Sequence, residues 1–230
     1  MIWINKSYEK LTEDYIRIHS NNLNWLIMSQ HQTLSESLIK EFKDKVNWYM
    51  ISIHQTLSED FIREFQRNVN WTMISKYQNI SEPFIAEFHN KVNWEYISST
   101  QTLSESFIIK FKDKVDWYWI LNDREFSEDF IRQVADKICW STISGRVLSE
   151  DFIREFNNKL DWDELTIMQV LSEDIIRDNI DRINWQHIAW YQKLSRDFIL
   201  EFINKLDIHL LLKYQELDPA TKEYLKLLKG

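Results

Sequence analysis

The sequence predicts an all-α fold, an α-solenoid of tandem 23-residue, two-helix repeats, and three observations carry this prediction. Glycine and proline occur only twice each in 230 residues, whereas average usage would give roughly 16 and 12. Sandwiches and barrels depend on such residues in their frequent turns, so these folds are nearly excluded. Tryptophan recurs at an almost constant interval, and helix start signals recur in the same register.

The repeat covers essentially the whole chain. Its tryptophans are separated by 23 residues, and once by 22: Trp25, Trp48, Trp71, Trp94, Trp117, Trp140, Trp162 and Trp185. A Leu-Ser-Glu motif keeps this register and begins at Leu34, Leu57, Ile80, Leu103, Phe126, Leu148 and Leu171. We therefore expect a single domain over residues 1–230 with about nine to ten repeats, with residues 1–24 as a partial capping repeat and 217–230 as a polar capping helix.

Each repeat is expected to fold as two short helices, as residues 57–79 illustrate. Ser58 is a good N-cap, and the acidic side chains after it favour the positive end of a helix. This first helix, of about ten residues, has one apolar face, which is formed by Phe61, Ile62, Phe65 and Val69. Asn70 is the next N-cap, and a second helix of about eight residues should end near Gln78 without needing glycine.

Neighbouring repeats must pack against one another, because a helix pair of this size cannot bury its own Trp and Phe side chains. A glutamine recurs seven residues after the tryptophan position, at Gln32, Gln55, Gln78, Gln101, Gln169, Gln192 and Gln215. We expect these amides to bond helix-end carbonyls and the N–H groups of neighbouring loops, forming a ladder between repeats.

The repeated charges are interpreted mainly as a solvated helix face, with an anion-binding arginine row as the alternative. Acid-before-base pairs four residues apart contribute about 0.2–0.5 kcal/mol each. One series comprises Glu13/Arg17, Glu36/Lys40, Glu59/Arg63, Glu128/Arg132, Glu150/Arg154 and Glu173/Arg177. A second series comprises Glu41/Lys45, Glu87/Lys91, Glu155/Lys159, Asp178/Arg182 and Glu201/Lys205.

Composition and motifs also argue against several classes of function. The formal charge of -8 disfavours nucleic-acid binding by phosphate neutralisation. The longest apolar run, residues 117–121, is far shorter than the ~20 residues of a membrane span. Cys139 is the only cysteine, so a reducing, cytoplasmic location is expected. No nucleophile–base pair, phosphate loop or metal motif is present, so we expect neither an enzyme nor a cofactor or metal.

Repeat units such as residues 57–65 and 71–82 resemble the tandem Trp/Leu-Ser-Glu repeats of many uncharacterised proteins of large DNA viruses and some bacteriophages. The resemblance spans nearly the whole chain. It implies a short-unit helical solenoid of viral origin, located in the host cytoplasm. Such proteins often bind host factors, but the family brings no activity.

The side chains that follow the tryptophan by one or two residues are the first candidate site. They are large in several repeats and vary between repeats: Tyr49, Met50, Met73, Tyr96, Tyr118, Trp119 and His187. Tyr and Trp anchor interfaces and Met adapts to them, so this row favours a protein-binding groove. Packing between neighbouring short helices is the alternative.

Residues 117–149 form the second candidate, because the pattern fails there at many positions. Leu121 replaces the usual Ser, Cys139 replaces the capping Asn or Asp, and one residue is lost beside Gly145. Such a break marks either a bend or a ligand notch. The notch would be formed by Trp119, Asp123, Arg124 and Arg146.

These observations favour a non-enzymatic repeat scaffold that binds a protein partner. The alternative is a sponge that sequesters a small anionic, nucleotide-like ligand near the irregular repeat at residues 117–149.

Overall fold

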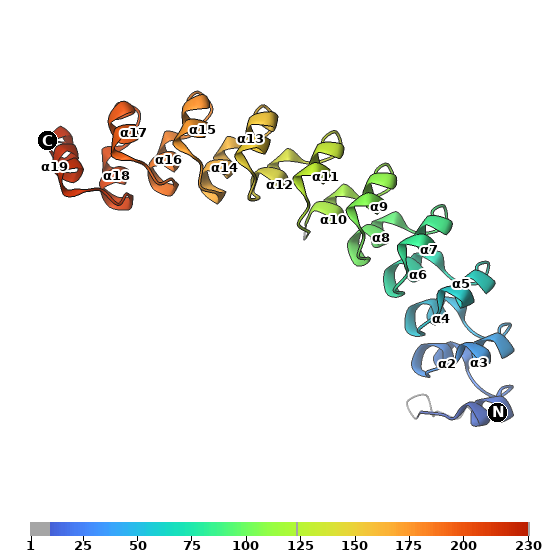
Figure 1. The fold of residues 1–230 in the computed structure, drawn as a ribbon. Coiled ribbons are helices and arrows are strands. Elements are labelled where there is room, and N and C mark those ends of the chain that lie inside the picture. Colours follow the sequence, from blue (N-terminus) through green and yellow to red (C-terminus); the bar gives the residue numbers. More distant parts are fainter. Residues whose placement is uncertain (1–9, 123, 230) are drawn as a thin grey trace. The chain divides into compact units, whose positions relative to one another are not determined.

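The structure is a computed structural model that describes residues 10–122 and 124–229 (Figure 1). Within these residues it contains nineteen helices and no strand. The helices recur with the period of the tryptophans, two to a repeat, so the predicted all-α solenoid of 23-residue repeats is confirmed. The predicted capping repeat at residues 1–24 is described from residue 10 onward.

The helices alternate between two kinds. The first helices of the repeats are α1 (Glu13–His19), α3 (Glu36–Glu41), α5 (Glu59–Glu64), α7 (Glu82–Glu87), α9 (Glu105–Lys110), α11 (Glu128–Gln133), α13 (Glu150–Phe156), α15 (Glu173–Asp178) and α17 (Arg196–Glu201). The second helices are α2 (Trp25–His31), α4 (Trp48–His54), α6 (Trp71–Tyr77), α8 (Trp94–Thr100), α10 (Trp117–Asn122), α12 (Trp140–Ser144), α14 (Trp162–Met168), α16 (Trp185–Tyr191) and α18 (Ile208–Tyr214), followed by α19 (Pro219–Lys229).

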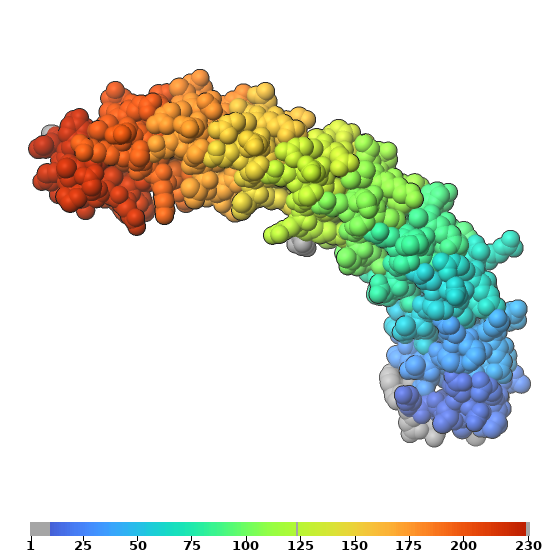
Figure 2. Space-filling model, viewed as in Figure 1, coloured from blue at the N-terminus to red at the C-terminus, as the bar shows by residue number. Residues whose placement is uncertain are grey.

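The chain divides into two compact units, Met1–Glu125 and Phe126–Gly230, called unit 1 and unit 2 below. In unit 1, each even-numbered helix from α2 to α8 packs against the next, and in unit 2 the same holds from α12 to α18. Within each unit the odd-numbered helices form a second row (Figure 1). Neighbouring repeats of a unit lie in direct contact in the space-filling view (Figure 2). The single domain over residues 1–230 stays a prediction.

Helix boundaries follow the predicted caps. The Ser58 hydroxyl accepts the Phe61 N–H, and the Asn70 amide oxygen accepts the Met73 N–H. The second helix ends at Tyr77, as predicted, and Gln78 takes an extended backbone conformation. No described residue has a positive φ, which explains how the chain turns in every repeat with so few glycines.

The first helices are shorter than predicted. The helix α5 has six residues rather than about ten, because Phe65 leaves the helical region at φ -102° and ψ 27°. The chain then turns, and the Asn68 and Val69 N–H groups both donate to the Phe65 carbonyl. Phe65 and Val69 remain buried, so the apolar face predicted from their spacing is formed by a helix plus a turn.

The core is continuous between neighbouring repeats of a unit. Ile62, Ile74 and Ile85 are fully buried, and burial of each such side chain contributes about 1.5–3 kcal/mol. The Trp48 ring stacks on Phe65 of the next repeat with ring centroids 5.0 Å apart. Its indole N–H donates to the Lys43 carbonyl at 2.9 Å, so the half-buried ring satisfies its polar atom.

The glutamine ladder is confirmed. Gln55 is buried, and its amide Nε2 donates to the carbonyls of Ser29 and Gln32 in the preceding repeat, at 3.0 and 2.8 Å. Its Oε1 accepts the Leu34 N–H at 2.9 Å. The same three bonds recur at Gln78, Gln101, Gln192 and Gln215. One side chain thus satisfies three buried backbone groups at each of these joints.

Two further ladders connect repeats. The Ser52 hydroxyl donates to the Trp48 carbonyl at 2.7 Å and accepts the N–H of the next capping residue, Asn70, at 2.9 Å. The Glu59 carboxylate accepts the Ser81 N–H at 2.6 Å, so the Glu of one Leu-Ser-Glu motif binds the Ser of the next. The repeated serines and acids are therefore connectors between repeats as well as local caps.

The charged side chains pair differently from the prediction. The first series forms within helices at Glu13/Arg17, Glu59/Arg63, Glu128/Arg132, Glu150/Arg154 and Glu173/Arg177, whereas Lys40 contacts Glu64. The second series was predicted to pair within one helix, and this prediction was wrong. Its acidic residues form ion pairs with a basic residue of the preceding repeat. These pairs are Arg17–Glu41, Arg63–Glu87, Arg132–Glu155, Arg154–Asp178 and Arg177–Glu201.

The irregular repeat weakens these connections within unit 2. The helix α12 has five residues and ends at Gly145, and Cys139 makes no side-chain hydrogen bond that caps it. Gln169 keeps the bond from the Leu148 N–H at 2.8 Å. Its Nε2 is buried and has no acceptor among the residues that the structure describes. At this joint, beside the residue lost near Gly145, two of the three ladder bonds are therefore missing.

The last helix differs from the polar helix that was predicted. The helix α19 packs against α18 and buries Leu225 and Thr221. It also carries Tyr224, Leu227 and Leu228 as exposed side chains.

The contrast between two glutamines gives a stability prediction. Gln78→Leu keeps the side-chain volume but leaves three buried backbone groups unpaired, and each such group costs about 1–3 kcal/mol. Gln169→Leu leaves one N–H unpaired and also removes an unsatisfied amide. We expect a large fall in the thermal unfolding midpoint for Gln78→Leu and a much smaller one for Gln169→Leu. Equal effects would contradict the ladder description.

The missing cap gives a second prediction. Cys139→Asn supplies the oxygen that caps the other second helices, so we expect stabilisation by about 0.5–2 kcal/mol in urea unfolding. The reverse change, Asn70→Cys, is the matched control and should destabilise by a similar amount. No gain at position 139 would show that the short helix α12 does not depend on its cap.

Candidate partner-binding surface

The predicted row beside the tryptophans divides into two kinds of position. Residues one after the tryptophan point outward, as Tyr49 and Tyr118 do with 47% and 69% of their surface exposed. Residues two after it are half-buried at Met50 and Met73. Exposure at the first position agrees with the predicted binding groove and partial burial at the second with the packing alternative, although Trp119 at the second position is exposed; both stay predictions.

Several members of this row have defined contacts. The Tyr96 ring is half-buried and lies 5.0 Å from the Lys76 ammonium. Trp119 is 40% exposed and meets Tyr118 edge-on, with ring centroids 5.2 Å apart. His187 is half-buried, with Nδ1 3.4 Å from the Asp163 carboxylate. These contacts position the side chains.

The residues proposed for a ligand notch are divided between the two units, so the notch stays a prediction. The Arg124 guanidinium donates to the carbonyls of Ser98 and Gln101 at 3.0 and 2.7 Å, so it replaces the ladder glutamine. Burial lowers the pKa of Arg124. Trp119 and Arg124 belong to unit 1. Asp123 lies outside the described residues.

Arg146 belongs to unit 2, where its guanidinium carbon lies 5.8 Å from the Phe126 ring centroid. It is half-buried and follows the end of α12. It occupies the ladder position of its repeat, two residues before the Leu-Ser-Glu motif. Both arginines therefore stand where other repeats carry the glutamine.

A surface that the sequence prediction missed lies in unit 2, at the C-terminal ends of the second helices. Its side chains are large, apolar and exposed, with exposed fractions from 36% to 88%: Val147, Ile167, Met168, Val170, Trp190, Tyr191 and Tyr214. They come from α14, α16, α18 and the segments between α12 and α13 and between α14 and α15. We call this set the apolar strip.

Comparison with the other repeats shows that the strip is a local feature. Val147 and Val170 each stand one residue after the ladder position, directly before a Leu-Ser-Glu motif, and are 88% and 72% exposed. At the same motif position unit 1 has exposed polar residues, which are Thr33, Thr56, Asn79 and Thr102. Aligning this column of the repeat would have found the strip from the sequence.

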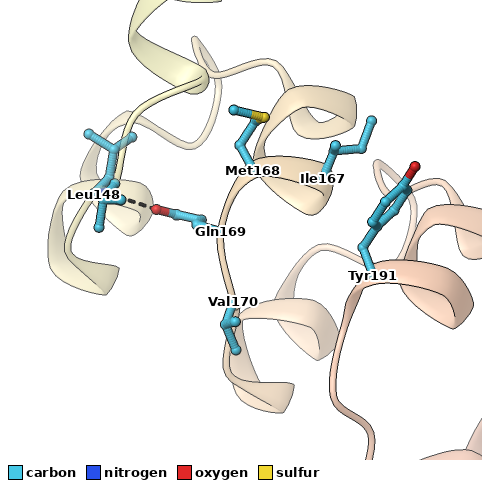
Figure 3. A pocket seen from close by; sticks show the side chains of 7 residues that line it. Leu148, Ile167, Met168, Gln169, Val170 and Tyr191 are labelled. Carbon is cyan, nitrogen blue, oxygen red and sulfur yellow. Dashed lines mark hydrogen bonds between the residues drawn. The ribbon is translucent and has the colours of Figure 1, made fainter. Parts of the chain in front are cut away.

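Two adjacent cavities lie along the strip. The first, of about 440 Å³, is lined by Val147, Leu148, Ile167, Met168, Gln169, Val170 and Tyr191, and we call it the aliphatic pocket. Figure 3 shows Ile167 and Met168 at the end of α14, with Tyr191 of α16 across from Ile167. Both cavities have volumes in the range of about 300–1,000 Å³ that is usual for ligand sites.

The second cavity, of about 400 Å³, is lined by Trp190, Tyr191, Gln192, Lys193, Leu194, Tyr214, Gln215 and Glu216, and we call it the aromatic pocket. The Trp190 ring stacks on Tyr191 at 5.5 Å and on Tyr214 of the next repeat at 4.9 Å. The ring planes differ by only 7° and 20°. Tyr191 lines both pockets and is therefore their common wall.

The described residues carry no cluster of metal-ligating side chains, because they contain no group of three or more His, Cys, Asp or Glu side chains that could hold a metal ion. None of their helices has the length and apolar character needed to cross a bilayer. Cys139 is exposed, and a hydrogen bond with the Ser141 hydroxyl, 3.0 Å away, lowers the pKa of its thiol.

The fold defines a helical solenoid of short tandem repeats. Comparisons of the chain with protein-family models, with curated proteins and with solved structures found no match. The resemblance to the viral repeat proteins therefore stays a prediction.

The Cys139 environment gives a prediction of pH dependence. Donors to the thiolate lower its pKa, so alkylation by iodoacetamide should rise with pH at a lower midpoint than for a free cysteine peptide. Ser141→Ala removes the donor that lowers this pKa most and should move the midpoint upward. An unchanged midpoint in Ser141→Ala would contradict the assignment.

Proposed function

We propose that the protein is a non-enzymatic repeat scaffold that binds a protein partner, and that the apolar strip of unit 2 is its binding surface. The observation that carries this proposal is the pair Val147 and Val170. Two consecutive repeats expose valine at a position where unit 1 carries polar residues, most often Thr. Contiguous exposed apolar surface of this kind marks interaction sites in soluble proteins.

The composition of the strip supports a protein partner. Trp and Tyr bury a large area with few rotatable bonds, and Met fits varied shapes, so these residues anchor protein interfaces. All three types occur in the strip, beside cavities that could receive partner side chains. The resemblance to viral repeats extends the proposal to a host factor as the partner, met in the host cytoplasm.

The earlier candidates contribute less to this proposal. Tyr49 and Tyr118 are exposed and remain candidates for a secondary contact. The alternative, an anionic ligand at the irregular repeat, loses its main support because Arg124 already donates to two backbone carbonyls.

Selection from a random peptide library displayed on phage tests the proposal. Wild-type protein should enrich peptides that share a motif. Val147→Thr combined with Val170→Thr introduces the residue found in unit 1, keeps the side-chain shape and should abolish enrichment. Tyr77→Ala is the matched control, because Tyr77 is 49% exposed at the position in unit 1 equivalent to Tyr191. It should leave enrichment intact.

Two results would overturn the proposal. One is the absence of any shared motif with wild-type protein that is shown to be folded by circular dichroism. The other is a motif that the double threonine variant enriches as well as wild type, because binding would then lie elsewhere.

A further inference from the structure

The strip presents its pockets at a regular interval. The aliphatic pocket lies at the joint of α14 and α16, and the aromatic pocket at the joint of α16 and α18. These helices pack side by side, and packed helices have axes about 8–10 Å apart. An occupant that fills both pockets must therefore repeat its apolar groups at about this spacing.

A peptide in the polyproline II conformation has this spacing. It has three residues per turn and rises about 3.1 Å per residue, so side chains three residues apart lie about 9 Å from one another on the same side. Side chains seven residues apart on one face of a helical peptide lie about 10.5 Å from one another, so the interval alone admits both conformations. The ring geometry and the charges of the strip decide between them.

The ring geometry agrees with this occupant. Trp190, Tyr191 and Tyr214 are nearly parallel and remain 46%, 44% and 36% exposed. Proline-rich segments dock in grooves lined by aromatic side chains. Single-stranded nucleic acid also stacks on exposed rings, but Tyr191 is the one ring among the residues that line the neighbouring pocket, where Val147, Ile167, Met168 and Val170 offer no stacking surface for further bases.

Charge distinguishes the two ends of the strip. Its aliphatic pocket has no charged lining residue, whereas Lys193 and Glu216 line the aromatic pocket. The Lys213 ammonium lies 4.8 Å from the Tyr214 ring centroid. Two lysines beside one glutamate give this end a positive balance in a chain of net charge -8. An acidic group on the occupant is complementary to this end.

We infer that the apolar strip recognises a proline-rich peptide in the polyproline II conformation, which places apolar side chains three residues apart in the two pockets and a carboxylate beside Lys193 and Lys213. This inference rests on the proposed function, because it names the partner of the same surface. Tyr191 is the central specificity residue, since it forms the wall shared by both pockets.

Fluorescence anisotropy with the full chain tests the inference. The probe is a labelled peptide of four Pro-Pro-Leu triplets followed by Asp-Asp, and the control peptide has the same composition with the leucines out of the three-residue register. The in-register probe should bind about tenfold more tightly or better. Tyr191→Ala should weaken its binding by at least about tenfold, the effect of an interface anchor, whereas Tyr77→Ala should not change it.

A second comparison tests the charged end. The double variant Lys193→Ala/Lys213→Ala should weaken binding of the Asp-Asp probe and leave binding of an otherwise identical Asn-Asn probe unchanged. Equal loss for both probes would overturn the assigned carboxylate position.

The remaining outcomes separate this inference from the proposed function. If the phage selection yields peptides that depend on Val147 and Val170 but lack the three-residue register, the strip binds a protein and the polyproline inference is wrong. Equal binding of the in-register and control peptides also overturns it. If a labelled oligothymidylate binds in a manner lost in Trp190→Ala, the stacked rings serve nucleic acid and the inference is again wrong.

Discussion

The recurrent glutamine amide is the interaction on which the regular repeat depends. A short helix that ends without glycine leaves carbonyls unpaired, and the loop after it leaves an N–H unpaired, all in surroundings that exclude water. At Gln55 one side chain satisfies two such carbonyls of the preceding repeat and one such N–H, that of Leu34, with which its own repeat begins. A repeat can therefore complete its own hydrogen bonds only when the next repeat is present, which links backbone satisfaction to stacking. The core also requires the next repeat, because the Trp48 ring packs on Phe65 of that repeat.

The irregular repeat shows what happens when this interaction is changed. Arg124 reaches the same two carbonyls as a glutamine, so a longer, charged donor can replace the amide within unit 1. After the one-residue loss beside Gly145, by contrast, Gln169 retains only its bond from the Leu148 N–H. The aliphatic pocket is lined by both of these residues. The strip thus begins at the joint where the ladder of unit 2 is incomplete, and a locally weakened joint is a common setting for a functional surface.

Much of the fold could be predicted because each local signal repeats about nine times and errors in one copy are corrected by the others. Ser58 and Asn70 identify helix starts by capping chemistry alone, and Gln78 identifies a helix end. The length of α5 could not be predicted, because Phe65 keeps the apolar spacing of a helix while its backbone leaves the helical region. The sequence predicted Lys91 as the partner of Glu87, because it follows four residues later. The partner in the structure is Arg63, which is adjacent only after the repeats stack. The strip was missed because the predicted surface comprised the residues just after each tryptophan. It did not include the position before each Leu-Ser-Glu motif, where Val147 and Val170 stand.

The absence of positive φ angles in the described backbone has a consequence for how such a chain can diversify. A corner that required a left-handed residue would be restricted to glycine or asparagine, whereas an extended corner accepts any side chain without strain. The residue before each Leu-Ser-Glu motif varies accordingly, from Thr56 to Val170 to Lys193. Duplication of a repeat followed by single substitutions at these corners can therefore produce a new surface chemistry while the scaffold beneath it stays the same. An engineer could exploit the same freedom by moving a chosen side chain from one copy to another along the array.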